Sequence, residues 1–226
     1  MMSQFNYFSE SEQQSQQRFK QLRDNLLSPL VRGMSAIGLT PNLLSLLGLV
    51  VLAPFVWMLL QGSEPGQVRL AFWFLILHVV LDGLDGPLAR HQGKSGPAGT
   101  LVDMVCDHLG MVVVSITLIQ VGLLHATLGA LYVFLYTTSV VFIVVLNQIE
   151  RPFRFVFRSK YVLYGILLCY AVFNVNYLDT AVVLFVVCDL VISIRGFGKL
   201  YQWLEESQAN NNSEKSPNAE ESTERN

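Results

Sequence analysis

The sequence predicts an all-α integral membrane protein with six transmembrane helices, preceded by an N-terminal juxtamembrane amphipathic helix. Of its 226 residues, 52% are hydrophobic and 14% are charged, a composition outside the usual range of soluble domains. The apolar residues also gather into stretches close to the length of about 20 residues that a helix needs to cross the hydrocarbon core. The chain is therefore expected to pass repeatedly through a lipid bilayer, and no nucleic-acid partner is expected.

The N-terminal region divides into two parts. Residues 1–17 are rich in Gln and Ser and lack the basic start and apolar core of a signal peptide, so we expect a disordered tail. Over residues 18–37, apolar residues recur at helical spacing among Lys20, Arg23 and Arg32. This pattern predicts an amphipathic helix that lies in the membrane interface.

Six apolar stretches follow within one predicted transmembrane domain, residues 38–203. We expect the spans over residues 42–60, 68–89, 99–123, 126–146, 161–175 and 178–198, of which the fifth is the shortest. The sequence shows no internal repeat. Residues 204–226 carry Asn, Ser and Glu without an apolar period, which predicts a disordered C-terminal tail.

Basic residues predict the topology, because Lys and Arg are enriched in cytoplasmic loops. They precede the first span and follow the second, fourth and sixth, whereas the opposite loops hold Arg69 alone. We therefore expect both termini, and the loop after the second span, in the cytoplasm. For a bacterial chain this would be the cytoplasmic membrane.

Four aspartates are the most informative polar residues: Asp82 and Asp85 at the end of the second span, and Asp103 and Asp107 near the start of the third. Four ionised carboxylates within a membrane could cost on the order of 10 kcal/mol, so an opposing charge is required. Salt bridges to Arg90 and Lys94 are too few to supply it. Clustered carboxylates suit Mg²⁺, Mn²⁺ or Ca²⁺, ions that in enzymes often also hold phosphates.

Helical spacing predicts how these aspartates meet. Asp82 and Asp85 share one helix face, as do Asp103 and Asp107. At about 1.5 Å per residue, Asp82 and Asp107 lie about 12 Å from the connecting loop, and the other two about 6 to 8 Å. Antiparallel neighbours would pair the carboxylates by depth, with Arg90 at the mouth as a phosphate partner. Such a cluster could hold one or two divalent ions.

The run matches the pattern D-x2-D-G-x2-A-R-x8-G-x3-D-x3-D at every fixed position and resembles the signature of the CDP-alcohol phosphotransferases. The resemblance implies that Asp82, Asp85 and Asp103 bind Mg²⁺ or Mn²⁺, and that Asp107 is a further ligand or the general base. It also implies a nucleotide and phosphate site formed by Gly86, Ala89, Arg90, Gly99 and Asn42. Asn42 lies in a segment, Thr40 to Ser45, that is similar to one often found in this family.

The activity that the resemblance implies is transfer of a phosphatidyl group from CDP-diacylglycerol to a small alcohol, with release of CMP. A homodimer is compatible with it. The identity of the acceptor alcohol stays open. Phosphatidylglycerophosphate synthases typically carry Pro after the third aspartate and Lys after the fourth, whereas this chain has Met104 and His108, which disfavours glycerol 3-phosphate. Serine, inositol phosphate, choline and other polyols remain as candidate acceptors. A basic set after the fourth span could bind an anionic acceptor or simply enforce topology: Arg151, Arg154, Arg158 and Lys160.

Two rival functions use the same carboxylates. An aspartate-rich membrane prenyltransferase would normally carry a second Asp-rich motif, and a cation transporter tends to show repeated halves. Neither feature is found in the sequence. His78 is expected to be a hydrogen-bonded helix histidine. Asp189 is a further acidic residue expected to be buried, in the sixth span, with Arg195 as a candidate partner. The three cysteines are expected to be inert core residues.

Overall fold

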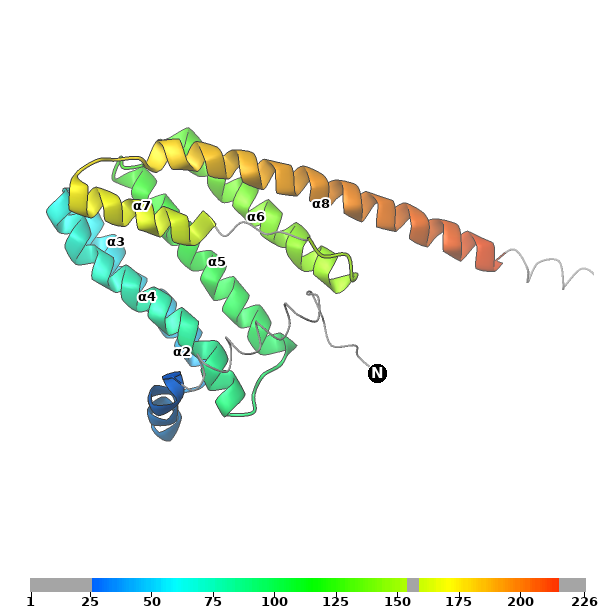
Figure 1. Ribbon diagram of the computed structural model, residues 1–226, viewed down its shortest axis with the longest axis horizontal. Coiled ribbons are helices and arrows are strands. Elements are labelled where there is room, and N and C mark those ends of the chain that lie inside the picture. Colours follow the sequence, from blue (N-terminus) through cyan, green and yellow to red (C-terminus); the bar gives the residue numbers. More distant parts are fainter. Residues whose placement is uncertain (1–25, 154–158, 216–226) are drawn as a thin grey trace, which may run out of the picture.

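The computed structural model describes residues 26–153 and 159–215, and every regular element within these ranges is a helix (Figure 1). Residues 26–36 form the first helix. The helices that follow are α2 (Pro41–Val50), α3 (Leu52–Gln61), α4 (Pro65–His91), α5 (Pro97–Gln120), α6 (Ala126–Gln148), α7 (Ser159–Phe173) and α8 (Leu178–Lys215). The all-helical prediction is confirmed for the described part of the chain.

Five helical segments are long and apolar enough to cross a membrane: Pro41–Gln61, Pro65–His91, Pro97–Gln120, Ala126–Gln148 and Leu178–Ala209. The first of them combines α2 and α3, which are separated at Val51. Pro54 explains this break, because proline lacks the N–H that would bond to the carbonyl four residues earlier, and its ring presses on that carbonyl. The predicted fifth span corresponds to α7, which is a shorter apolar helix of 15 residues.

The short connection between α4 and α5 is held against the start of α2. Gln92 Nε2 donates to the Leu39 carbonyl at 2.7 Å and to Ser35 Oγ at 3.3 Å. Thr40 caps α2 by accepting the Leu43 N–H, and Pro41 occupies the first helical turn, where its missing N–H costs nothing. These contacts fix the ends of α2, α4 and α5 relative to one another.

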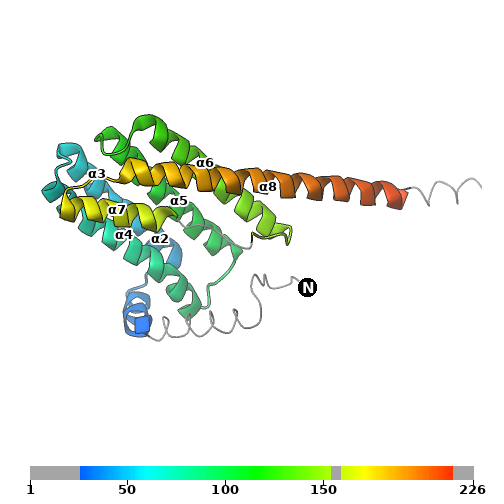
Figure 2. The same ribbon diagram turned by 45° about the horizontal axis from the view of Figure 1, so that its top comes forward.

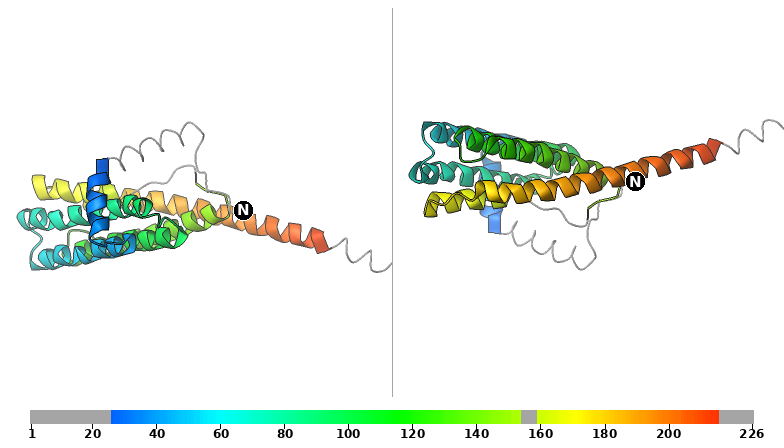
Figure 3. Two further views of the ribbon diagram at one scale, coloured as in Figure 1. Left: turned by 90° about the horizontal axis from the view of Figure 1, so that it is seen from below. Right: turned by 90° about the horizontal axis from the view of Figure 1, so that it is seen from above.

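Residues 26–36 lie across the long helices, as Figure 3 shows from below. Val31 is buried against Leu44, Leu84 and Leu88, whereas Leu26 is exposed. Val31, with the partly buried Leu27 and Met34, therefore docks the helix on α2 and α4, while Leu26 and Leu30 remain available to lipid, as an interfacial helix requires. The predicted segment 18–25, and the predicted tail 1–17, lie outside the described residues.

The helix α8 packs along α6 and continues past the rest of the bundle (Figures 1 and 2). Gly196 permits this packing, since a Cβ there would come within 2.7 Å of the Phe142 side chain. Residues 204–215 are helical, so the prediction of a disordered tail from residue 204 was wrong for them. An ion pair between Arg151 and Glu206 helps to explain the difference, because it ties this extension to the end of α6. Residues 216–226 lie outside the described part.

The helix α7 begins inside the bundle rather than at its surface. The hydroxyl groups of Ser159 and Tyr132 are 2.9 Å apart, and both residues are fully buried. Lys160, the second residue of α7, is also buried, with a side chain that is 3% exposed. A helix of 15 residues extends only about 22 Å, less than the roughly 30 Å of a typical hydrocarbon core.

Candidate active site

The four aspartates of the motif come together as two pairs, between the last turns of α4 and the first half of α5. Asp85 and Asp103 lie within hydrogen-bonding reach of each other. Asp82 and Asp107 share a single partner, the Lys160 ammonium. The expectation that antiparallel helices pair the carboxylates by depth is therefore confirmed. The two aspartates closer to the connecting loop, Asp85 and Asp103, meet each other, and the two farther from it, Asp82 and Asp107, share Lys160.

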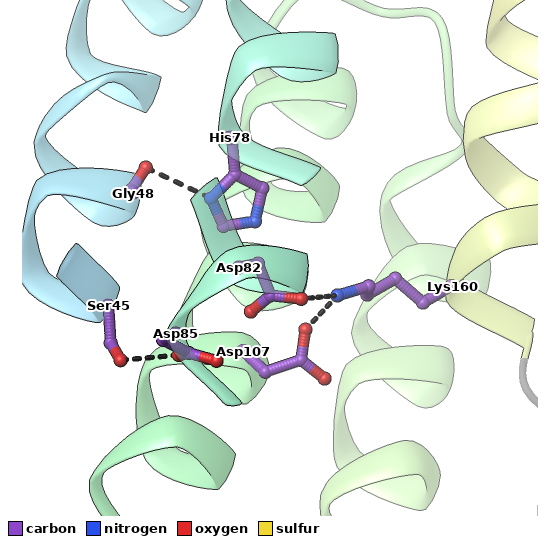
Figure 4. A network of polar contacts seen from close by, with 7 residues as sticks. All are labelled: Ser45, Gly48, His78, Asp82, Asp85, Asp107 and Lys160. Carbon is purple, nitrogen blue, oxygen red and sulfur yellow. Dashed lines mark hydrogen bonds and ion pairs between the residues drawn. The ribbon is translucent and has the colours of Figure 1, made fainter. Parts of the chain in front are cut away.

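Ser45 on α2 positions the Asp85 carboxylate. Its hydroxyl group donates to Asp85 Oδ2 at 2.6 Å, and both side chains are buried (Figure 4). Ser45 lies one turn after Thr40 and Pro41, where α2 begins, so the start of α2 fixes the position of the Ser45 hydroxyl group relative to Asp85. The segment singled out before the first span thus contributes directly to the site.

Lys160 is the functional residue whose position sequence reasoning missed. Its Nζ lies 3.3 Å from Asp82 Oδ2 and also forms an ion pair with Asp107, as Figure 4 shows. In the sequence, Lys160 belongs to the basic set that follows the fourth span, 53 residues after Asp107. The available signal was the excess of buried carboxylates over local cations, which requires a positive charge from elsewhere in the chain.

A cavity of about 720 Å³, here called the loop-side cavity, opens between the start of α2 and the connection from α4 to α5. All five predicted nucleotide and phosphate residues line it: Asn42, Gly86, Ala89, Arg90 and Gly99. Gly99 at the start of α5 lies beside Asn42 of α2, and a Cβ there would make an ordinary contact with Asn42 Oδ1, at 3.9 Å. The structure therefore assembles this predicted group around a single space.

A second cavity, of about 560 Å³, lies on the other side of the carboxylates and is here called the α7-side cavity. Its wall includes Asp82, Asp107 and Lys160, together with residues of α6 such as Ser139 and Asn147. Four residues line both cavities: Asp85, Gly86, Arg90 and Asp103. The two spaces thus meet at one carboxylate pair and one guanidinium group.

The predicted basic acceptor residues do not stay together. Lys160 lines the α7-side cavity, whereas Arg151 is paired with Glu206 on α8 and is not part of the cavity wall. Arg154 and Arg158 lie outside the described residues. Lys160 therefore carries the structural support for an acceptor role.

His78 and Asp189 have structural partners. His78 is buried, with Nδ1 2.9 Å from the Gly48 carbonyl (Figure 4), and its ring fills the space beside Gly110, so its interpretation as a packed, hydrogen-bonded histidine is confirmed. Asp189 accepts a 3.3 Å hydrogen bond from Ser139 rather than pairing with Arg195. Because Ser139 also lines the α7-side cavity, Asp189 supports one part of that wall from behind.

The four carboxylates of the motif suit a hard divalent cation chemically, but in this structure they are not arranged around a single point as metal ligands. Asp85 and Asp103 place two acidic groups in contact, an arrangement that favours a bound proton or cation. Carboxylate oxygens are also the preferred protein ligands of Mg²⁺ and Mn²⁺. Within the described ranges, however, no three His, Cys, Asp or Glu side chains converge as a metal site. Asp82 and Asp107 are instead turned toward the Lys160 ammonium.

Curated relatives match the part of the chain that holds the motif. Phosphatidylinositol phosphate synthase from Mycobacterium tuberculosis is 29% identical over 84 residues, which cover 37% of this chain and 37% of that protein. The enzyme of the same name from Mycobacterium marinum is 30% identical over 82 residues, covering 36% and 34%. The match thus spans little more than a third of these relatives' length.

Solved structures share the fold over a longer stretch. The Mycobacterium tuberculosis phosphatidylinositol phosphate synthase with CDP-DAG bound superposes with a TM-score of 0.65 at 17% identity, covering 77% of this chain and 92% of that one. Its complex with manganese and citrate gives 0.63, covering 76% and 88%. A family model described as CDP-alcohol phosphatidyltransferase matches residues 38–195. This match takes in the first five apolar segments, most of the predicted sixth and the whole aspartate motif, and the chain therefore belongs to the CDP-alcohol phosphatidyltransferase family.

Proposed function

We propose that this protein transfers a phosphatidyl group from CDP-diacylglycerol to a small alcohol, releases CMP and depends on a divalent cation. The observation that carries the proposal is the meeting of two cavities at Asp85, Asp103 and Arg90. A transfer between two substrates needs separate spaces for donor and acceptor with one shared point between them. The family membership and the names of the relatives support the same reaction.

The loop-side cavity is the proposed donor site. Its lining combines polar side chains with several small residues, which let backbone approach a nucleotide closely. Arg90, in both cavity walls, would hold the pyrophosphate, because a guanidinium group can bind phosphate oxygens bidentately. The solved relative with CDP-DAG bound supports a CDP-lipid as donor.

The bonds exchanged follow from this arrangement. The oxygen of the acceptor hydroxyl attacks the lipid-side phosphorus, a new P–O bond forms, and the bond to the CMP oxygen breaks. The hydroxyl proton passes to a carboxylate, and CMP leaves with an added negative charge. When bound, a divalent cation would neutralise charge on the pyrophosphate, and Asp82, Asp85 and Asp103 are the residues proposed to hold it.

Asp107 is the proposed general base. It lines the α7-side cavity and is absent from the lining of the loop-side cavity, so it faces the acceptor rather than the nucleotide. Its side chain is 33% exposed, which leaves it accessible to a hydroxyl group. A base must come within hydrogen-bond reach of the proton that it removes.

The acceptor is proposed to bind in the α7-side cavity. Asn147, Ser139 and Tyr161 offer hydrogen-bonding groups there, and Lys160 offers a positive charge. This lining supports a small polyhydroxylated or anionic alcohol. The names of the relatives favour an inositol phosphate within that class.

The proposed orientation places both termini and both cavities on the cytoplasmic side. Arg90 lies in the last turn of α4, Lys94 follows α4 and Arg151 follows α6; these helix ends lie near the cavities, and positive residues favour the cytoplasmic face. A water-soluble nucleotide could then enter from the cytoplasm while the acyl chains remain in lipid. The family resemblance also supports a homodimer, which light scattering of the purified protein would test.

Purified protein supplied with CDP-diacylglycerol, Mn²⁺ and a panel of alcohols provides the test. We expect CMP release that depends on one acceptor and stops with a chelator, with a matching phospholipid product. Release of diphosphate from a prenyl diphosphate, without CMP formation, would instead support the prenyltransferase alternative. Cation flux into vesicles without either reaction would support a transporter.

A further inference from the structure

The Lys160 ammonium group lies between α4 and α5, where the clustered carboxylates of the motif require a positive charge. Its side chain is 3% exposed, and its ammonium group contacts Asp82 of α4 and Asp107 of α5 at once. Figure 4 shows the lysine reaching from α7 to the gap between these two carboxylates. One buried ammonium therefore neutralises part of the charge of the motif and links three helices.

The same contact opposes the proposed metal site. Two of the four carboxylates are turned toward Lys160, and no three described acidic, His or Cys side chains converge on one point. Asp82 is both a proposed metal ligand and a partner of the Lys160 ammonium group, and a divalent cation on this carboxylate would repel that ammonium group strongly where water is excluded. Metal binding by Asp82, Asp85 and Asp103 therefore favours withdrawal of Lys160.

The α7-side cavity provides a place for the withdrawn side chain. Lys160 lines this cavity of about 560 Å³, and a lysine side chain has four flexible methylene groups. Its Nζ already lies 4.9 Å from the centre of the Tyr161 ring, a position in which the ring can stabilise a cation. Asn147 and Ser139 add polar groups to the same wall. The ammonium can therefore move without entering lipid.

We propose that Lys160 is the counter-ion of the metal-free site, and that a divalent cation displaces its ammonium group from Asp82 and Asp107 into the α7-side cavity. This inference rests on the proposed metal-dependent function and adds a coupling to it. Withdrawal frees Asp107 and leaves a positive charge in the cavity proposed for the acceptor. Metal binding and assembly of an acceptor site for an anionic alcohol are thereby linked.

Mn²⁺ binding to the purified protein in lipid nanodiscs, followed by the loss of the free-ion electron paramagnetic resonance signal, tests the competition. We expect Lys160→Met to bind Mn²⁺ at least about tenfold more tightly than wild type, because no ammonium has to leave. Lys199→Met is the matched control: Lys199 donates to the Pro152 carbonyl, away from both cavities, and its variant should bind like wild type. Equal or weaker binding by Lys160→Met overturns the inference.

Reductive methylation of wild-type protein tests the movement itself and does not depend on a variant that folds. We expect Mn²⁺ to increase the labelling of Lys160, measured by mass spectrometry of its peptide, while the labelling of Lys199 stays constant. Labelling of Lys160 that is unchanged or slower with Mn²⁺ contradicts displacement. Wild-type protein that binds no Mn²⁺ overturns the metal site and this inference together, whereas normal Mn²⁺ binding without the two Lys160 effects overturns the inference alone.

Discussion

The two cavities beside the aspartate motif differ in how the chain builds them. The loop-side cavity is lined entirely by residues between Thr40 and Asp103, from α2, α4, α5 and the loops that join them. The α7-side cavity adds residues of α6 and α7, up to Tyr161. One cavity is thus a local feature of the motif, and the other depends on the packing of distant helices.

This difference suggests a division of labour. A donor common to a whole family can be bound by a local motif whose spacing fixes its geometry. An acceptor that varies within the family is better recognised by helices outside the motif, where substitutions leave the shared chemistry intact. We therefore expect a substitution where the cavities meet, at Asp85, Asp103 or Arg90, to reduce transfer most. Substitution of a binding residue that lines only one cavity should change the KM of one substrate.

The largest effect is expected at the junction of the cavities. Asp85→Asn should lower transfer by about 10³-fold or more, because it removes a charge needed in the transition state while nearly preserving shape. Asp179→Asn is the matched control, since Asp179 accepts the His125 N–H at the other end of the bundle. Initial rates of CMP release measure both. More than a tenth of wild-type activity in Asp85→Asn at saturating Mn²⁺ would exclude Asp85 as an essential residue.

Asp107→Asn should reduce the rate by about 10² to 10⁴-fold, the range typical of a lost general base. Because Asp107 lines the α7-side cavity, binding of CDP-diacylglycerol should stay close to that of wild type. Equilibrium binding of the donor, measured beside turnover, separates these effects. A parallel loss of Mn²⁺ affinity would reassign Asp107 as a metal ligand.

A matched pair of asparagines tests the separation of the cavities. Asn42→Ala should raise the KM for CDP-diacylglycerol roughly 3- to 10-fold, and Asn147→Ala should do the same for the acceptor, as expected for one lost hydrogen bond. Each variant should leave the other KM nearly unchanged. If both variants change the same KM, the two cavities do not serve different substrates.

The smallest effect is expected at Arg151. Arg151→Ala breaks an exposed pair with Glu206, so we expect unchanged kinetics and a loss of stability below about 1 kcal/mol. Arg90→Ala, which removes the guanidinium group shared by both cavities, is the comparison variant and should lower turnover strongly. A raised acceptor KM in Arg151→Ala would restore it to the acceptor site.

The same contrast explains what the sequence could predict. The spacing of Asp82, Asp85, Asp103 and Asp107 places them on facing helices, and helical geometry alone gave their pairing. The depth of Lys160 could not be read in this way, because it depends on where α7 enters the bundle and on the contact of Ser159 with Tyr132. The helical extension of α8 could not be read from an apolar period either, because residues 204–215 are mostly polar; an exposed ion pair between Glu206 and Arg151 accompanies it.

A structure of this protein with CDP-diacylglycerol and Mn²⁺ would decide which cavity binds the donor. We expect the cytidine and pyrophosphate in the loop-side cavity between Asn42 and Arg90, with the lipid-side phosphorus beside Asp85 and Asp103. The α7-side cavity should remain open to the acceptor. Nucleotide density in the α7-side cavity, beside Asn147 and Lys160, would contradict the assignment of donor and acceptor sites.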